Sequence, residues 1–94
     1  MQEQLIEIRR VIDTIDDQVV PLLARRIDLA LEAARYKHTA EEVSGCDRVQ
    51  KVLDSVAVRA RHANGNVYVI VGIYAFVIQA LTDLQLREKG MGER

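Results

Sequence analysis

The residues that could have a chemical role are polar side chains at positions where a helical pattern predicts apolar ones. An apolar seam in alternating steps of three and four residues runs from Leu5 to Leu22, and its next steps reach Arg26 and then Leu29. An unpaired guanidinium is costly to bury, so Arg26 either pairs with a carboxylate, reaches out to solvent or binds an anionic ligand.

Three more cations could join this site. Lys37 follows Arg26 by eleven residues, which returns to nearly the same face of a helix, although a lysine in a last turn also complements the helix dipole. Arg9 lies 17 residues before Arg26, which is about 25 Å along a helix. It could therefore bind only a ligand held by a second chain, or else it is a solvated surface residue. Arg48 lies in a first helical turn, where the dipole disfavours a cation, so it is either a ligand contact or a surface residue.

An uncharged donor ends a second apolar stripe. Gln85 is the next helical step in the series Val67, Val71, Tyr74, Ile78 and Leu81. Its amide is either a hydrogen-bonded core group or a donor to a ligand.

The sequence has no Ser/His/Asp or Cys/His arrangement, no metal-ligand spacing and no glycine-rich phosphate loop. His38 and His62 are isolated and expected to face solvent, and the acidic pairs 16–17 and 41–42 suggest solvated faces. The remaining donors suit anion binding, or a reaction that needs only positioning and charge stabilisation.

Composition narrows the class of protein. The 94 residues include 13 Lys and Arg against 14 Asp and Glu, a net charge of −1 that creates no field for nucleic acid or an acidic membrane. Aromatic residues make up 4% and Trp is absent, which argues against stacking on bases. Three features favour a cytoplasmic protein. Cys46 is the single cysteine, the start of the sequence does not resemble a signal peptide, and the apolar stretch at 67–78 is too short to span a bilayer.

The pattern predicts an all-α chain with one domain over residues 1–94. The first helix is expected from about residue 3 to 38, bent rather than split by Pro21, with a loop at 39–46. Such a helix would be roughly 50 Å long, beyond the width of a globule of this mass. A second copy of the chain is the simplest partner for its seam.

Two further helices complete the prediction. Asp47 and Gln50 resemble a capping box that opens the second helix, and Gly65 is suited to a left-handed stop at its end. Asn66 can cap a third helix that runs to about residue 89, and residues 90–94 are expected to form a frayed, flexible tail.

These segments resemble the AroQ class of all-helical chorismate mutases and the related isochorismate-pyruvate lyases. The similarity extends from Leu5 to Gln85 and is carried by IRRVIDTIDDQVVPLLARR, ARYKH, the Asp47-Arg48-Val49 start of helix two and IYAFVIQALTDLQ. The resemblance implies an intertwined homodimer, a place in the shikimate pathway of aromatic amino acid biosynthesis and the conversion of chorismate to prephenate without a metal or cofactor.

The resemblance also implies roles for individual residues. Arg9, donated across the dimer, and Arg26 would hold the substrate carboxylates, and Lys37 and Gln85 would donate to the ether oxygen. Arg48 would position the ring. On the same basis Arg26, Lys37 and Gln85 would be the catalytic residues.

Two apolar residues, Val49 and Leu81, are also expected to contact the substrate. Val49 stands where family mutases often carry an acidic residue that meets the ring hydroxyl. Isochorismate-pyruvate lyase or 4-amino-4-deoxychorismate mutase activity is therefore an alternative at the same site. A non-catalytic helical dimer with a regulatory or partner-binding role is the alternative from another class.

Overall fold

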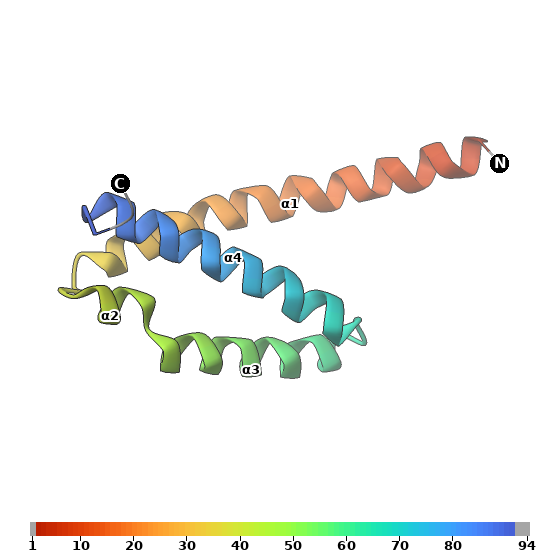
Figure 1. The fold of residues 1–94 in the computed structure, drawn as a ribbon. Coiled ribbons are helices and arrows are strands. Elements are labelled where there is room, and N and C mark those ends of the chain that lie inside the picture. Colours follow the sequence, from red (N-terminus) through yellow and green to blue (C-terminus); the bar gives the residue numbers. More distant parts are fainter. Residues whose placement is uncertain (1, 92–94) are drawn as a thin grey trace.

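A computed structural model describes residues 2–91 and shows four helices, with no strand among those residues (Figure 1). They are α1 (Gln2–Ala34), α2 (Ala40–Ser44), α3 (Cys46–His62) and α4 (Val67–Glu88). The predicted all-α class with three long helices is confirmed. The predicted loop at 39–46 is wrong in part, because it contains the short helix α2.

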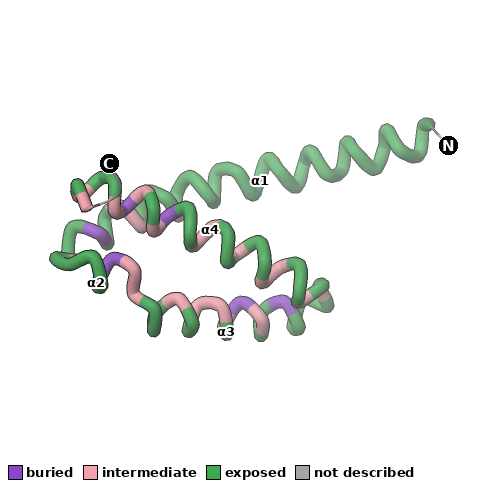
Figure 2. Tube along the Cα trace, in the orientation of Figure 1, coloured by how far each residue is buried: buried purple, intermediate pink, exposed green. Residues whose placement is uncertain are grey.

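Helix α1 is continuous through Pro21, so the proline does not split it. Its N-terminal half extends away from the other helices, and every residue from Gln2 to Arg25 is exposed (Figures 1 and 2). The described chain therefore measures 54 × 25 × 21 Å. The seam from Leu5 to Leu22 has no cover within its own chain.

The core forms where α4 packs on the other three helices. The buried apolar residues are small in number and mostly small in size, namely Ala34, Val43, Val56, Ala60 and Leu81. They fix the C-terminal end of α1, together with α2 and α3, against α4. The packing of α4 against the other three helices is thus what can position a site.

The helix starts differ in part from those predicted. A complete capping box opens α2, since the Thr39 hydroxyl accepts from the Glu42 amide and the Glu42 carboxylate accepts from the Thr39 amide. The predicted box at Asp47 and Gln50 is wrong. Helix α3 starts at Cys46, its N-cap Gly45 supplies no side-chain bond, and the Gln50 amide donates instead to Asp54 one turn on.

The turn between α3 and α4 comprises residues 63–66. The left-handed stop is Asn64, with φ 57°, and not Gly65 as predicted. The Gly65 amide donates 2.8 Å to the Ala60 carbonyl, and an added Cβ at Gly65 would lie 2.6 Å from Ile70 Cδ1. A side chain at Gly65 would therefore displace the end of the Ile70 side chain. Asn66 caps α4 as predicted by accepting from the Val69 amide at 3.0 Å.

The chain end also differs from the expected frayed tail over residues 90–94. Gly90, with φ 70°, closes α4 in an ordered stop in which the Met91 amide donates 2.8 Å to the Leu86 carbonyl. Residues 92–94 lie outside the described part of the chain.

Helix α4 is more apolar and less covered than expected. Its 22 residues are long and apolar enough to cross a membrane by length and composition alone, with a mean hydropathy of 1.9 over the most apolar window. Only 6% of that window is buried within the chain, so the expected buried helix is wrong for a single protomer. Residues 67–78, which alone are too short to span a bilayer, are only the first part of this helix.

Candidate active site

A small cavity of about 160 Å³ lies where the C-terminal part of α1, the start of α3 and the C-terminal half of α4 meet. Its lining includes six residues singled out from the sequence, namely Arg26, Lys37, Arg48, Val49, Leu81 and Gln85. Ala30, Ala33, Val52 and Ile78 complete it. The structure thus brings together all of the predicted site residues except Arg9.

Among residues 2–91, three cations line this cavity and no carboxylate does. The ion pair found within residues 2–91 joins Arg10 to Glu7, far along α1, so Arg26 does not form the interhelical ion pair considered from the sequence. Its guanidinium carbon lies 5.8 Å from the centre of the Tyr74 ring instead. This distance is within the range of a cation–π contact, which leaves the guanidinium donors free for an anion.

Gln85 is the buried polar residue of the wall, with 5% of its surface exposed. Its Nε2 donates a hydrogen bond of 2.6 Å to the backbone carbonyl of Ala30. The core-amide interpretation is therefore correct for one of its N–H groups. The second N–H and the Oε1 atom are still available to a ligand, so the two interpretations are compatible.

Lys37 reaches the cavity by a different route from the one predicted. Helix α1 ends at Ala34, and the amides of Tyr36 and Lys37 donate to the carbonyls three residues back at 3.0 and 3.1 Å. Lys37 is therefore in a tight turn and not on the helical face of Arg26, because the last turn tightens before the chain leaves the helix.

The acidic side chain that holds this turn is Glu42, which is exposed, as the sequence predicts, and also accepts hydrogen bonds from the backbone. Glu42 accepts from the His38 amide at 2.5 Å and from the Thr39 amide at 3.1 Å. These two backbone bonds, the His38 bond foremost, lower the pKa of Glu42 below its ordinary value. The spacing Thr39-x-x-Glu42 is typical of a capping box, so the sequence does contain the pattern of this cap, which the predicted loop at 39–46 does not include.

Part of the cavity wall is apolar. Val49 and Val52 of α3 face it, together with Ile78 and Leu81 of α4. Such a wall suits the carbon skeleton of a small ligand whose charged groups meet the cations. Val49 offers no hydrogen-bond acceptor to a ligand hydroxyl.

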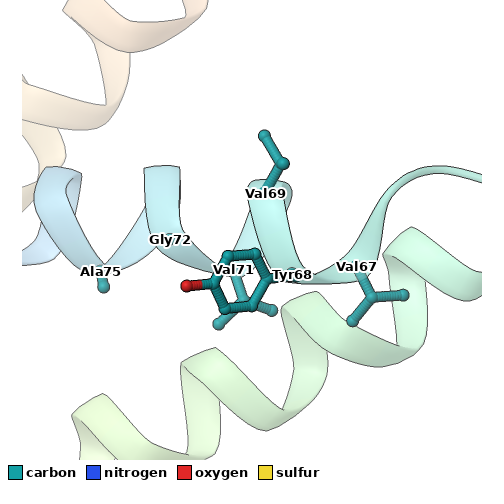
Figure 3. A pocket seen from close by; sticks show the side chains of 6 residues that line it. All are labelled: Val67, Tyr68, Val69, Val71, Gly72 and Ala75. Carbon is teal, nitrogen blue, oxygen red and sulfur yellow. The ribbon is translucent and has the colours of Figure 1, made fainter.

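A larger open hollow of about 680 Å³ lies at the other end of α4. Figure 3 shows its lining of Val67, Tyr68, Val69, Val71, Gly72 and Ala75, in which the Tyr68 hydroxyl is the one polar side-chain group. Nothing in this lining can neutralise an anion. It is an apolar surface, and the smaller cationic cavity is the better candidate for chemistry.

Arg9 is separated from the cavity. It lies on the exposed N-terminal half of α1, which projects away from the rest of the chain (Figure 1). Within a single protomer it cannot reach a ligand bound beside Arg26, in agreement with the distance argument from the sequence.

An all-α chain with a small cationic cavity and a partly apolar wall defines a class of helical protein whose site suits a small organic anion. Comparison with known protein families matches residues 8–86 to chorismate mutase type II, and the chain therefore belongs to this family. The family consists of isomerases of the shikimate pathway that convert chorismate to prephenate. A comparison with curated proteins found no match.

Proposed function

We propose that the cavity lined by Arg26, Lys37, Arg48 and Gln85 is the site where this chain converts chorismate to prephenate. The observation that carries the proposal is the convergence of three cations and a buried amide donor on one cavity, with no carboxylate in its lining as far as residues 2–91 are concerned. Chorismate is a dicarboxylate, and its rearrangement is unimolecular. The reaction therefore needs a compact substrate conformer and stabilised charge rather than a nucleophile.

Each polar residue has a role in this proposal. Arg26 binds a substrate carboxylate, and Arg48 helps to position the ring. Lys37 and the free N–H of Gln85 donate to the ether oxygen, which gains negative charge as its bond to carbon breaks. Donors that strengthen their bonds in the transition state raise kcat more than they lower KM.

We further propose that two chains form an intertwined homodimer in which Arg9 completes the partner's site. The proposal is supported by the exposed apolar seam of α1, whose members include Leu5, Ile8, Ile12, Ile15, Val19 and Leu22. An exposed apolar surface of this extent is uncommon on a monomer and typical of an interface.

Helix α4 supplies the complementary surface. Its residues Tyr68, Ile73 and Phe76 are 89%, 57% and 76% exposed. Phe76 also lines an apolar groove with Leu23 and Ile27 where α1 and α4 diverge. If α1 of a second chain packed into the groove between α1 and α4, it would cover its own seam and the exposed face of α4. It would also bring its Arg9 towards the cavity of the first chain.

A cytoplasmic location is part of the same proposal. It is supported by Cys46, an exposed and free thiol that suits a reducing compartment.

A product assay tests the reaction. The purified protein is incubated separately with chorismate, isochorismate and 4-amino-4-deoxychorismate, and prephenate, salicylate, pyruvate and the amino analogue of prephenate are followed. We expect prephenate from chorismate, and loss of that activity in Arg26→Met but not in Arg25→Met, an exposed neighbour that does not line the cavity. Absence of turnover with all three substrates would contradict the proposal.

The assay also decides a second candidate reaction at the same site. Val49 gives the cavity an apolar wall where a hydroxyl-binding acid would suit chorismate, and this favours isochorismate-pyruvate lyase as the alternative. Salicylate and pyruvate from isochorismate, without prephenate from chorismate, would establish it.

Light scattering tests the dimer. We expect the mass of two chains for the wild type and of one chain for Ile12→Glu, which places a charge in the seam. A monomeric wild type that turns over chorismate would contradict the shared site. A dimer that binds no oxabicyclic transition-state analogue would support the non-catalytic alternative.

A further inference from the structure

The position of Lys37 depends on a turn rather than on a helix. Helix α1 ends three residues earlier, at Ala34, and Lys37 is attached to it by a single backbone bond of 3.1 Å to the Ala34 carbonyl. A lysine side chain is long and flexible, so the place of its ammonium group depends on how well its backbone is fixed.

One carboxylate oxygen fixes the backbone that follows Lys37. Oε1 of Glu42 accepts from the amides of both His38 and Thr39, at 2.5 and 3.1 Å. The first of these amides belongs to the peptide bond between Lys37 and His38. Glu42 therefore sets the orientation of the peptide that leaves Lys37.

Glu42 is itself held in place. The Thr39 hydroxyl accepts from its amide at 3.1 Å, and the next residue, Val43, is buried with 2% exposure. At the other side of the turn, Ala34 is buried with 3% exposure. The turn thus runs between two anchored points of the core.

Little else holds the turn between those anchors. Tyr36 is 72% exposed, and Arg35, His38 and Thr39 are exposed as well. Within residues 2–91, Glu42 is the side chain that hydrogen-bonds to the backbone next to Lys37. The two other titratable groups that act on Glu42 are His38 in the turn and Lys89 at the end of α4, and both lower the pKa of its carboxyl.

We propose that Glu42 is a positioning residue for Lys37, whose carboxylate holds the turn so that the ammonium group enters the cavity. This inference rests on the proposed function of the cavity. It assigns to Glu42 an effect on the reaction that is transmitted through Lys37 and involves no contact with the substrate.

A double-mutant cycle tests the inference. Chorismate turnover and the affinity for an oxabicyclic dicarboxylate that mimics the transition state are measured for the wild type, Glu42→Ala, Lys37→Met and the double variant. We expect Glu42→Ala to lower kcat about tenfold with a smaller change in KM, since a misplaced group affects mainly the transition state. In the Lys37→Met background we expect Glu42→Ala to change the affinity for the mimic less than about twofold.

Three further variants separate positioning from folding. Glu42→Gln keeps one oxygen that can accept from both amides, so we expect it to restore most of the activity. Glu42→Asp keeps the charge at the start of α2 but is too short to reach the His38 amide, so it should lose activity even if Glu42→Ala fails to fold. Glu41→Ala removes the neighbouring exposed charge and should leave the activity unchanged.

The outcomes are distinguishable. Independent losses in the cycle, with an active wild type, would overturn the positioning role and leave the proposed function intact. A wild type that neither turns over chorismate nor binds the mimic would overturn the proposed function, and the inference with it.

Discussion

The Gln85 carboxamide and the Ala30 backbone carbonyl are joined by a hydrogen bond of 2.6 Å that links α4 to α1 in the wall of the cavity. A carbonyl can only accept, so this bond fixes the Gln85 nitrogen, and not its oxygen, towards α1. The orientation of the amide is therefore set before any ligand binds. Preorganised donors of this kind do not have to reorganise during the reaction.

Gln85→Glu should make both activity and stability dependent on pH. The introduced carboxyl can donate to Ala30 only when protonated, and burial raises its pKa in the folded chain above the unfolded value of about 4.3. The folded state then binds the extra proton more tightly. Stability should be highest below the unfolded pKa and fall as the pH rises through the folded pKa, and kcat/KM should fall with it.

Melting temperatures and kcat/KM measured from pH 4 to 9 check this expectation. Gln79→Glu is the matched control, because Gln79 is exposed on the same helix and bonds only to Asp83. A profile for Gln85→Glu that runs parallel to that of the control, in which the new carboxylate lies beside Asp83, would show that the Ala30 bond does not matter.

Arg26→Leu should separate stability from activity. Leucine fits the apolar seam, and the lost contact with Tyr74 is worth about 0.5–1 kcal/mol, so the free energy of unfolding should change by no more than about 1 kcal/mol. Loss of the carboxylate contact should lower kcat/KM by about 100-fold or more. Urea unfolding and steady-state kinetics provide the two measurements, with Arg25→Leu as the control, and a large fall in stability would argue that Arg26 is mainly structural.

Arg9→Ala and Arg26→Ala should complement each other. Each homodimer lacks one arginine at both sites and should be inactive, whereas a heterodimer contains one intact site. Mixing the two variants under conditions of subunit exchange should therefore restore up to about half of the wild-type activity per heterodimer, because one of its two sites is complete. Heterodimers that are verified by mass spectrometry and stay inactive would show that Arg9 does not act across the interface.

The turn around Lys37 should loosen in acid. The pKa of Glu42 lies below its ordinary value of 4.5 because the carboxylate accepts from the His38 and Thr39 amides. This stabilisation is present above the unfolded pKa and is lost as the pH falls through the folded pKa. Amide hydrogen exchange at His38 and Thr39, corrected for its intrinsic pH dependence, should lose protection over that range.

Glu42→Gln provides the comparison for the acid experiment, because its amide does not titrate. We expect the protection of the two amides to stay constant through the same range in this variant. Equal loss in both proteins would trace the effect to another group.

The parts of the fold that depend on apolar periodicity could be predicted from the sequence. Arg26 and Gln85 stood out because they interrupt regular stripes, and both line the cavity. Tyr74 belongs to the α4 stripe that Gln85 interrupts, but its contact with Arg26 depends on side-chain directions that periodicity does not specify. The helix ends were harder to predict, because Asn64 and Gly65 are both compatible with a left-handed conformation and the apolar pattern does not distinguish them, whereas the structure assigns it to Asn64.

Lys37 was placed correctly for the wrong reason. A helix extended to residue 38 would put Lys37 on the face of Arg26, whereas in the structure Lys37 reaches the cavity from a turn that Glu42 holds. The end of a helix depends on bonds made by the residues that follow it. The pattern of apolar residues contains no such information.

The exposed seam of α1 also determines how the chain can acquire its structure. The buried residues in the described range 2–91 are five apolar side chains and one glutamine, so this part of the protomer has almost no core of its own. In the proposed dimer most apolar burial is intermolecular, so folding and association are one step. The folding rate then depends on the square of the chain concentration, and the midpoint of thermal unfolding rises with the logarithm of that concentration.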